Sequence, residues 1–489
     1  MSSNLSARGA GGTHDLGNRA VVLGAGMSGL LAARVLADFY AHVTVVDRDN
    51  LSIDGRTRPG VPQGGHAHLL LPRGAKVMEK LFPGLFAELR EGGVPVARGL
   101  DQLHFDFRGH VLSQQKLGGD PHYGVSRPFL EDSVLRRVKS LPNLSLLDKH
   151  EVISLESDSS GTRVTGARIA CGAAPGGDAV VPADLVVAAT GHGGRMDAWL
   201  TELGYPVPRT QQVKVDVMYA TRRFRLSPGA TRGVLGVLAG PTPDRPLGMT
   251  AFAQEGGEWV VTLACYGRQH PPAELGPWLT FAARVAPPWF LSALLGARPV
   301  GNVDSCAFPA SLRRRYDKLE AFPEGLLAVG DEVCSLNPIY AQGMTLAALE
   351  SLVLRDALGG GRNHLAKRFF SAAAKPVSSA WHAAVNADLT MPSDIVPGAR
   401  SLPLRAVNAY VGGFQNAAER DPALALQLLK VTGLEKPARS LLAPRSLGRI
   451  VASVLSRSRD GAANERSALS PSSVDSPAAP AGKHLRARR

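Results

Sequence analysis

A glycine-rich turn between two apolar runs is the feature that most restricts how this chain can fold. Residues 19–39 read RAVVLGAGMSGLLAARVLADF, which predicts a strand, a tight turn and a helix. The turn has the spacing GxGxxG. Gly24 permits the tight turn, Gly26 lets backbone N–H groups approach a pyrophosphate, and Gly29 lets the helix pack closely on the strand. The pattern therefore predicts a Rossmann-type dinucleotide-binding unit.

An aspartate at the end of the next apolar run supports this prediction. Asp47 follows Val45 and Val46, and its carboxylate is suited to accept hydrogen bonds from a ribose diol. The N-terminus of the preceding helix would stabilise the charge of a phosphate. The alternatives are a glycine-rich turn without a ligand and a surface aspartate. The two features together, at this spacing, favour a nucleotide site.

A second acidic residue ends another predicted strand far along the chain. Residues 325–350 read GLLAVGDEVCSLNPIYAQGMTLAALE, in which Asp331 follows an apolar run and Gly343 opens an Ala-rich helix. Asp331 is suited to accept hydrogen bonds from ribityl hydroxyl groups. The N–H groups at Gly343 and Met344, with the helix dipole, suit the N1/C2=O edge of a flavin, which gains negative charge on reduction. A plain NAD dehydrogenase would leave this segment unexplained, so the sequence favours FAD.

Composition limits the class of protein. A chain of 489 residues, 44% hydrophobic and 20% charged, is typical of globular proteins with two or three domains. The net charge is +13, but the basic residues are scattered with few aromatic residues between them, so we expect no nucleic-acid partner. We find no apolar run long enough to span a bilayer and no signal-peptide core, and we expect a cytoplasmic protein. The four cysteines are far apart, so we expect no metal site.

Hydrophobic periodicity predicts the remaining elements. Helical spacing occurs at 73–90, 128–140 and over most of 345–458. Alternation of apolar and polar residues predicts strands at 151–170, 179–189, 213–226 and 258–267. The last two of these strands predict an antiparallel sheet with one exposed face. The amphipathic segment 402–434 could close a pocket, dimerise or contact a membrane, and we expect it to pack on the nucleotide-binding domain.

Three motifs in order resemble those of the group A flavin monooxygenase superfamily, which has the fold of para-hydroxybenzoate hydroxylase. They are GAGMSG with VVD, then DLVVAATGHGGR, then GLLAVGD, and the resemblance covers residues 19–360. It implies an α/β protein in which a Rossmann-type FAD-binding domain carries an inserted antiparallel β-sheet substrate domain and is followed by a C-terminal helical region.

The expected division of the chain follows from these patterns. It comprises a disordered tail (1–17), the first part of the FAD-binding domain with small insertions (18–205), the substrate-domain sheet (206–300), the second part of the FAD-binding domain (301–365), a helical region (366–460) and a disordered basic tail (461–489).

The resemblance also implies roles for individual residues. Asp331 would bind the ribityl chain, and the helix from Gly343 would face the flavin. Arg127, in Ser-Arg-Pro-Phe-Leu, would lie near the pyrophosphate, and His66 would lie beside the FAD. A surface arginine at a helix start and a structural histidine are the respective alternatives.

The middle motif departs from the family pattern. Relatives usually have Asp-Gly where this chain has Thr190-Gly191, although Arg195 keeps the arginine. In the family this motif supports both FAD and the transient NADPH. The electron source therefore stays open between NAD(P)H and a separate flavin reductase.

Shorter motifs resemble a narrower branch, the olefin epoxidases of polyether-antibiotic pathways. They are RPGVPQ with His66 and His68, then AATG, then Tyr219-Ala-Thr, then Asn337-Pro-Ile-Tyr. This resemblance implies epoxidation of an apolar polyketide polyene, free or bound to a carrier protein, by a flavin C4a-hydroperoxide. Pro338 would shape the space beside the flavin, or serve only as a helix-entry proline. Because such oxygen transfer needs a dry apolar pocket rather than a strong base, we assign no catalytic acid or base.

Other functions remain open from the sequence alone. The same chemistry could hydroxylate a polyketide or a terpene-like substrate in secondary metabolism. A flavin-dependent reductase of isoprenoid double bonds, similar to the geranylgeranyl reductases, shares the three-motif layout. A non-catalytic FAD-binding scaffold is the alternative from outside enzyme chemistry.

Overall fold

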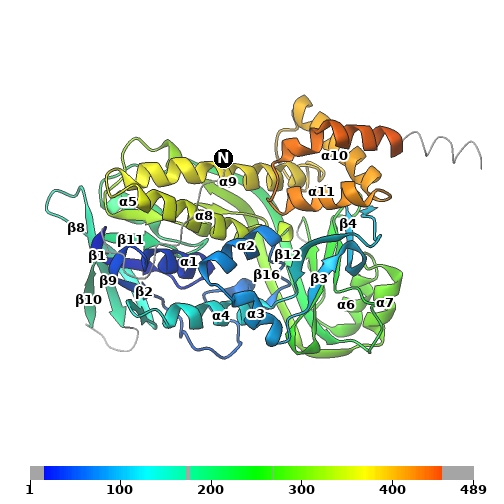
Figure 1. The fold of residues 1–489 in the computed structure, drawn as a ribbon, viewed down its shortest axis with the longest axis horizontal. Helices are drawn as coiled ribbons and strands as arrows, with labels where there is room; N and C mark the ends of the chain where they lie inside the picture. Colours follow the sequence, from blue (N-terminus) through cyan, green and yellow to red (C-terminus); the bar gives the residue numbers. More distant parts are fainter. Residues whose placement is uncertain (1–15, 172–176, 268, 454–489) are drawn as a thin grey trace, which may run out of the picture.

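The computed structural model describes residues 16–171, 177–267 and 269–453. The tails expected at 1–17 and 461–489 lie outside these residues, apart from Leu16 and Gly17. Figure 1 shows a parallel sheet with its helices at one end of the molecule and a larger sheet at the other end.

A five-stranded parallel sheet contains the glycine-rich turn. Its strand order is β17-β11-β1-β2-β7, and each neighbouring pair is parallel. The strands are β1 (Gly17–Leu23), β2 (Tyr40–Val46), β7 (Leu144–Leu147), β11 (Leu185–Ala188) and β17 (Leu326–Ala328). β17 joins this sheet from more than a hundred residues beyond β11. The parallel order brings the carboxyl ends of β1, β2 and β17 to one edge, where α/β proteins of this type bind ligands.

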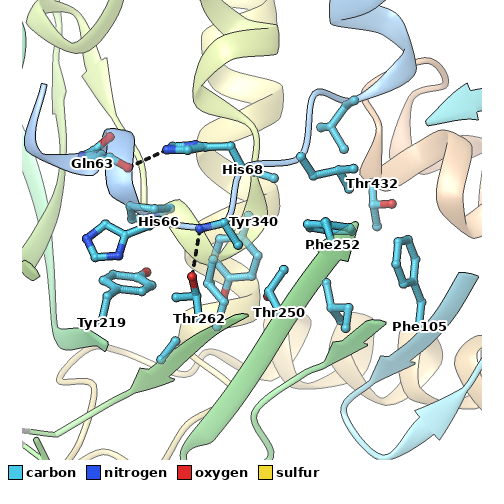
Figure 2. Close-up of a pocket in the computed structure, with 18 of the residues that line it drawn as sticks. Gln63, His66, His68, Phe105, Tyr219, Thr250, Phe252, Thr262, Tyr340 and Thr432 are labelled. Atoms are coloured by element: carbon cyan, nitrogen blue, oxygen red, sulfur yellow. Dashed lines mark hydrogen bonds between the residues drawn. The ribbon is translucent and has the colours of Figure 1, made fainter. Parts of the chain in front are cut away.

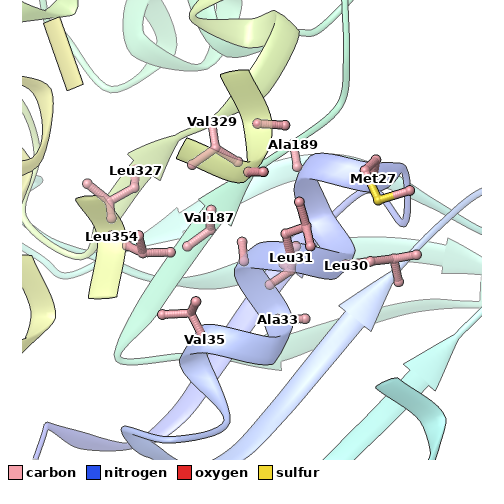
Figure 3. Close-up of a cluster of buried hydrophobic side chains, with 14 of the residues drawn as sticks. Met27, Leu30, Leu31, Ala33, Val35, Val187, Ala189, Leu327, Val329 and Leu354 are labelled. Atoms are coloured by element: carbon pink, nitrogen blue, oxygen red, sulfur yellow. The ribbon is translucent and has the colours of Figure 1, made fainter. Parts of the chain in front are cut away.

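Helix α1 (Met27–Leu36) packs directly on this sheet. Leu30 and Leu31 are almost fully buried and belong to one hydrophobic cluster with Val187 and Val329, toward which Leu31 points (Figure 3). Burial of one such aliphatic side chain contributes about 1.5–3 kcal/mol. α8 (Gly343–Gly359) packs against α1, and α9 (Leu365–Asp388) packs against α8. The helical layer therefore continues from the N-terminal motif to the C-terminal half of the chain.

Most predicted helices and strands are present, with one interruption. The helix expected at 73–90 is two helices, α2 (Pro72–Leu81) and α3 (Leu85–Glu91). Gly84 has φ 82°, a left-handed conformation that ends the helical path, and it follows Pro83. α4 (Arg127–Lys139) begins at the expected place, with the Ser126 side chain accepting a hydrogen bond from the backbone N–H of Phe129.

The remaining small sheets are antiparallel. β8 (His150–Ser157), β9 (Val164–Cys171) and β10 (Asp178–Pro182) form a three-stranded sheet, as the alternation predicted. β3 (Val96–Gly99) pairs with β6 (Gly118–Tyr123).

The larger sheet has eight strands in the order β18-β16-β12-β15-β14-β13-β4-β5. The strands are β4 (Leu103–Phe107), β5 (His110–Val111), β12 (Thr210–Arg225), β13 (Gly236–Ala239), β14 (Leu247–Ala253), β15 (Trp259–Cys265), β16 (Arg298–Arg314) and β18 (Cys334–Ser335). β16 runs across the domain boundary expected at residue 300, and β4 and β5 come from the first 120 residues. A cut at residue 300 would therefore divide a continuous strand.

The expectation of one exposed sheet face is wrong for β15. All seven residues of β15 are buried. Helices α6 (Leu275–Ala282) and α7 (Pro288–Leu295) cover one side of the sheet, where Trp278 and Phe290 pack against it. Sequence alternation does not reveal this cover, because the covering helices follow the strand in the chain.

The C-terminal helices pack on the large sheet. α10 (Leu402–Ala418) and α11 (Pro422–Thr432) place Phe414, Leu424 and Leu428 in one cluster with Phe105 and Phe252. The segment therefore packs mainly on the large sheet, while Leu434 at its end joins the core of the nucleotide-binding part, where it was expected. Among the described residues, no helix is both long and apolar enough to cross a membrane.

The glycine contact between α1 and β1 gives the first prediction. A Cβ at Gly29 would overlap the carbonyl oxygen of Gly24, whereas a Cβ at Gly26 would have no heavy atom within 4 Å. We expect Gly29→Ala to destabilise the protein by about 1–3 kcal/mol through overpacking. Gly26→Ala, at φ −68°, is the matched control and should change stability by less than about 0.5 kcal/mol. Chemical denaturation of the two variants without added ligand tests this, and equal midpoints would contradict it.

Candidate functional site

Two cavities meet at the carboxyl edge of the parallel sheet. The larger one, which we call the cleft, has about 2100 Å³ of empty space including its opening. The smaller one, which we call the pocket, has about 980 Å³ on the same measure. Both fall at or above the size that small-molecule sites occupy. The residues that line both cavities are Gln63, His68, Leu69, Pro338 and Ala341.

The first half of the cleft is the N-terminal motif. Gly24 has φ 105°, and a Cβ there would overlap the carbonyl oxygen of Ala189. Gly26 lines the cleft with open space beside it, as close approach of a pyrophosphate requires. Gly29 lies behind the turn rather than in the cleft, in the packing role expected for it.

Asp47 also lines the cleft. Its carboxylate accepts hydrogen bonds from the backbone N–H groups of Ala25, at 2.5 Å, and Asp49, at 2.8 Å. Burial raises the pKa of Asp47, and these two hydrogen bonds oppose the shift. The contacts fix the carboxylate beside the glycine turn.

The second half of the cleft comes from the segment after β17. Asp331, Gly343 and Met344 all line the cleft. Burial raises the pKa of Asp331, while the charges of His192 and Arg127 lower it. No side chain among the described residues caps the N-terminus of α8, so its first N–H groups are free to meet a ligand at the cleft. The tertiary structure thus brings Asp331 and Asp47 to the same cavity.

Arg127 lies in the wall of the cleft. It starts α4, and its Nη2 atom lies 2.6 Å from a carboxylate oxygen of Glu131. A second arginine, Arg58, lies 3.4 Å from Glu131 and 3.8 Å from Asp47. The Nη1 atom of Arg58 is buried and has no hydrogen-bond partner among the described residues. In the sequence, Arg58 stood only as the first residue of the RPGVPQ motif, without a predicted role, and its side chain does not line the cleft.

His66, which the resemblance placed beside the FAD, does not line the cleft. It lies in the pocket, where its Nδ1 atom is 2.7 Å from the hydroxyl of Thr221. His68, two residues later, lines both cavities, and its Nε2 atom is 2.7 Å from the carbonyl oxygen of Gln63. Burial lowers the pKa of His68 to about 4, so its ring is neutral at physiological pH. The hydrogen bond to Thr221 holds His66 against the large sheet and away from the cleft.

Glu332 is a residue that sequence reasoning missed. Thr190, which replaces the usual aspartate of the middle motif, donates a hydrogen bond from its hydroxyl to the Glu332 carboxylate. A Cβ at Gly194 would overlap this carboxylate, so the loop 190–195 lies directly against it. Burial raises the pKa of Glu332 to about 7, and the hydrogen bond from Thr190 opposes that shift. A carboxyl group therefore supports the middle motif from the next residue after Asp331.

The pocket has a polar end and an apolar end (Figure 2). Gln63, His66 and Thr262 lie at one end, and Phe105 and Phe252 lie at the other. The backbone N–H of Ala67 donates to the Thr262 hydroxyl at 2.8 Å. Helix α11 adds Leu429 and Thr432 to the wall. The C-terminal helices therefore help to enclose this pocket.

The cleft has the features that FAD requires. It combines a glycine turn at a helix N-terminus, carboxylates at Asp47 and Asp331, an arginine at 127 and an uncapped helix start at Gly343. Gly26 leaves open space in the cleft, which suits the close approach of a phosphate group. The residues present thus fit a flavin dinucleotide along the cleft with its ring toward Pro338.

Comparisons with known proteins agree with this geometry. The chain is 36% identical to Protein Rv3254 of Mycobacterium tuberculosis over 434 residues, which covers 84% of this chain and 89% of that protein. It is 28% identical over 367 residues to the 6-methylpretetramide 4-monooxygenase of Streptomyces rimosus, covering 72% of this chain and 78% of that enzyme. No family model matches the chain.

The fold is shared with solved flavoenzymes. The p-nitrophenol 4-monooxygenase PnpA of Pseudomonas putida DLL-E4 superposes with a TM-score of 0.57 at 15% identity, covering 86% of this chain and 98% of that one. The expected α/β architecture, with an antiparallel substrate sheet and C-terminal helices, is thereby confirmed. The chain belongs to the same family as Protein Rv3254, and it shares the fold of the p-nitrophenol 4-monooxygenase PnpA.

Proposed function

We propose that the chain binds FAD in the cleft and transfers one oxygen atom of dioxygen to an apolar substrate held in the pocket. The substrate we favour is a polyketide polyene or a terpene-like molecule of secondary metabolism, free or bound to a carrier protein, which the enzyme epoxidises or hydroxylates. The observation that carries the proposal is the shared wall of the two cavities at Pro338 and Ala341. A substrate and a cofactor ring on either side of this wall would be neighbours.

The residues of the cleft have separate tasks in this proposal. The turn at Gly24 and Gly26 would receive the pyrophosphate, with Arg127 beside it. Asp47 would hold the ribose, and Asp331 the ribityl chain. The first N–H groups of α8, at Gly343 and Met344, would face the pyrimidine edge of the flavin. Bound and reduced, FAD supplies the activation of dioxygen, with electrons from NAD(P)H or a separate flavin reductase.

The charge state of the pocket favours a neutral, apolar substrate over a charged one. Burial lowers the pKa of His66, and burial raises the pKa of the Cys306 thiol. Burial also raises the pKa values of Tyr219 and Tyr340 well above 10. These lining groups are therefore neutral at pH 7. A neutral, largely apolar wall suits transfer of oxygen to an electron-rich double bond and excludes water from the reacting atoms.

A flavin-dependent reductase of isoprenoid double bonds is the second candidate, because the same neutral apolar pocket would also hold a prenyl chain. The two activities differ in their use of dioxygen. A monooxygenase consumes dioxygen and adds one oxygen atom to the substrate. A reductase adds two hydrogens to the substrate, and its product does not change when dioxygen is removed.

Loss of the carboxylate at position 331 should weaken FAD binding. Asp331→Ala removes an acceptor for the ribityl hydroxyls, and we expect at least a tenfold rise in the FAD dissociation constant, or about 1.4 kcal/mol or more. Asp38→Ala, a half-exposed acid at the end of α1, is the matched control and should bind FAD like the wild type. Quenching of FAD fluorescence on titration with protein measures both. Equal affinities in the two variants would contradict the assignment of Asp331.

Oxygen transfer itself can be tested with labelled dioxygen. The FAD-loaded protein is reduced chemically and mixed with ¹⁸O₂ and an apolar polyene, and the products are weighed by mass spectrometry. We expect one labelled oxygen atom in the product and no product without dioxygen. Saturation of a double bond in the absence of dioxygen would favour the reductase. FAD binding with no product from any polyene or terpene would contradict the proposed substrate class.

A further inference from the structure

Five polar side chains from distant parts of the chain meet behind the pocket, and all of them except the half-buried Tyr340 are buried. They come from β12, from the residue after β15, from the loop before α8 and from the last residue of α9. Asn337 and Asp388 are fully buried, and Tyr266 is almost fully buried. The five side chains are Tyr219, Tyr266, Asn337, Tyr340 and Asp388. We call them the Asp388 cluster.

Hydrogen-bond directions within the Asp388 cluster are fixed by its chemistry. The Asn337 Nδ2 atom donates to the Tyr266 hydroxyl at 2.9 Å and to Asp388 Oδ1 at 3.0 Å. The Tyr266 hydroxyl therefore accepts from Asn337 and donates its own proton to Asp388 Oδ1, at 2.9 Å. One carboxylate oxygen thus accepts from both neighbours, and this orients the amide of Asn337.

The same carboxylate and amide determine where two phenol hydroxyls point. Tyr340 donates to Asp388 Oδ1 at 2.7 Å, and Tyr219 donates to Asn337 Oδ1 at 2.8 Å. Both tyrosine rings line the pocket, whereas Asn337 and Asp388 do not. Each ring therefore presents its carbon atoms to the pocket and turns its hydroxyl away from it. Without an acceptor behind the wall, a buried hydroxyl would have to find a partner elsewhere.

The cluster also anchors the residue that separates the two cavities. Asn337 precedes Pro338, and its backbone N–H donates to the Ser311 hydroxyl at 3.0 Å. Its side-chain oxygen accepts a further hydrogen bond from the backbone N–H of Ile339 at 3.3 Å. The loop around Pro338 is thus held from both sides, and Asp388 holds it from α9.

We propose that Asp388 is a positioning residue that determines which part of a substrate can lie against this wall. By accepting from Tyr340 and orienting Asn337, it withholds two hydroxyl groups from the pocket and fixes the loop at Pro338. The segment of substrate that lies against Tyr219, Tyr340 and the loop at Pro338 is therefore hydrocarbon, such as a run of conjugated or isolated double bonds. This inference rests on the proposed function and specifies its substrate.

The buried carboxyl of Asp388 lowers the stability of the protein when it is charged. The pH dependence of stability therefore gives a measurement that is independent of ligand binding. Asp388 Oδ2 is buried and has no hydrogen-bond partner among the described residues. Burial raises the pKa of Asp388 to about 6, although hydrogen bonds from Tyr340, Tyr266 and Asn337 lower it. The titratable groups facing the carboxyl are the phenols of Tyr266 and Tyr340, whose pKa values burial raises well above 10, so they stay protonated. The stability that comes from holding a proton on Asp388 is present below about pH 4 and is lost as pH rises through about 6.

Two substitutions at this position separate positioning from folding. Asp388→Asn keeps an acceptor oxygen in place, and Asp388→Ala removes it. The probe is diphenylhexatriene, an apolar polyene whose fluorescence rises in a dry pocket, titrated into the full chain without added FAD. We expect Asp388→Ala to bind it about tenfold more weakly, and Asp388→Asn to stay within about threefold of the wild type. FAD affinity, measured separately, should change less than threefold in either variant because Asp388 does not line the cleft.

Each result that differs from these expectations would have its own meaning. Unchanged probe affinity in Asp388→Ala would overturn the positioning role and leave the proposed function intact. Equal loss of probe and FAD affinity in both variants would show a role in folding alone. Wild-type protein that binds FAD and no probe would overturn the hydrocarbon wall, whereas wild-type protein that binds neither would contradict the proposed function itself.

Two further measurements test the role of Asp388 if the Asp388→Ala variant does not fold. Tyr340→Phe removes a hydroxyl that points away from the pocket, so probe affinity should stay within about threefold of the wild type, and a tenfold loss would overturn the inference. The melting temperature of Asp388→Asn should rise relative to the wild type between about pH 4.5 and pH 7.5, because the asparagine carries no charge to bury. A difference in melting temperature that does not change with pH would contradict the conclusion that Asp388 is buried and holds a proton.

Discussion

The contact between Gly24 and Gly29 is the constraint on which the rest of the structure depends. It lets α1 approach β1 at backbone distance and directs the N-terminus of that helix at the edge of the parallel sheet. The strand order places the ends of β1, β2 and β17 at that same edge. Asp47 and Asp331, nearly three hundred residues apart, therefore line one cavity. A bulkier residue at Gly29 would push the helix away from the strand.

The junction at Pro338 links the nucleotide-binding part of the molecule to the substrate sheet. Pro338 lines both cavities, and its neighbour Asn337 is bound to the large sheet through Tyr219 and to α9 through Asp388. Any ligand pair in the two cavities would meet across this loop. The position of the loop is thus set by hydrogen bonds from both halves of the structure rather than by local conformation.

Buried acids recur beneath the loops that form the cleft. Glu350 accepts a hydrogen bond from the backbone N–H of Gly330 at 2.7 Å, and burial raises its pKa to about 8. The Glu332 carboxylate accepts a hydrogen bond from the Thr190 hydroxyl of the middle motif. In both cases a carboxyl group satisfies a polar group of a loop that packs too tightly for water. Such groups hold their protons near neutral pH, because an unpaired charge at these depths would cost several kcal/mol.

The sequence by itself determined the elements whose information is local. The GxGxxG spacing, the acid at the end of β2 and the acid after β17 predicted a nucleotide cleft, since turn geometry and strand ends depend on neighbouring residues. Only the tertiary structure decided which distant side chains meet. It placed His66 in the pocket instead of the cleft, brought Glu332 under Thr190, and set α10 and α11 on the large sheet. The physical reason is that these contacts depend on sheet register and on which face a later helix covers, and neither leaves a periodic signal in the chain.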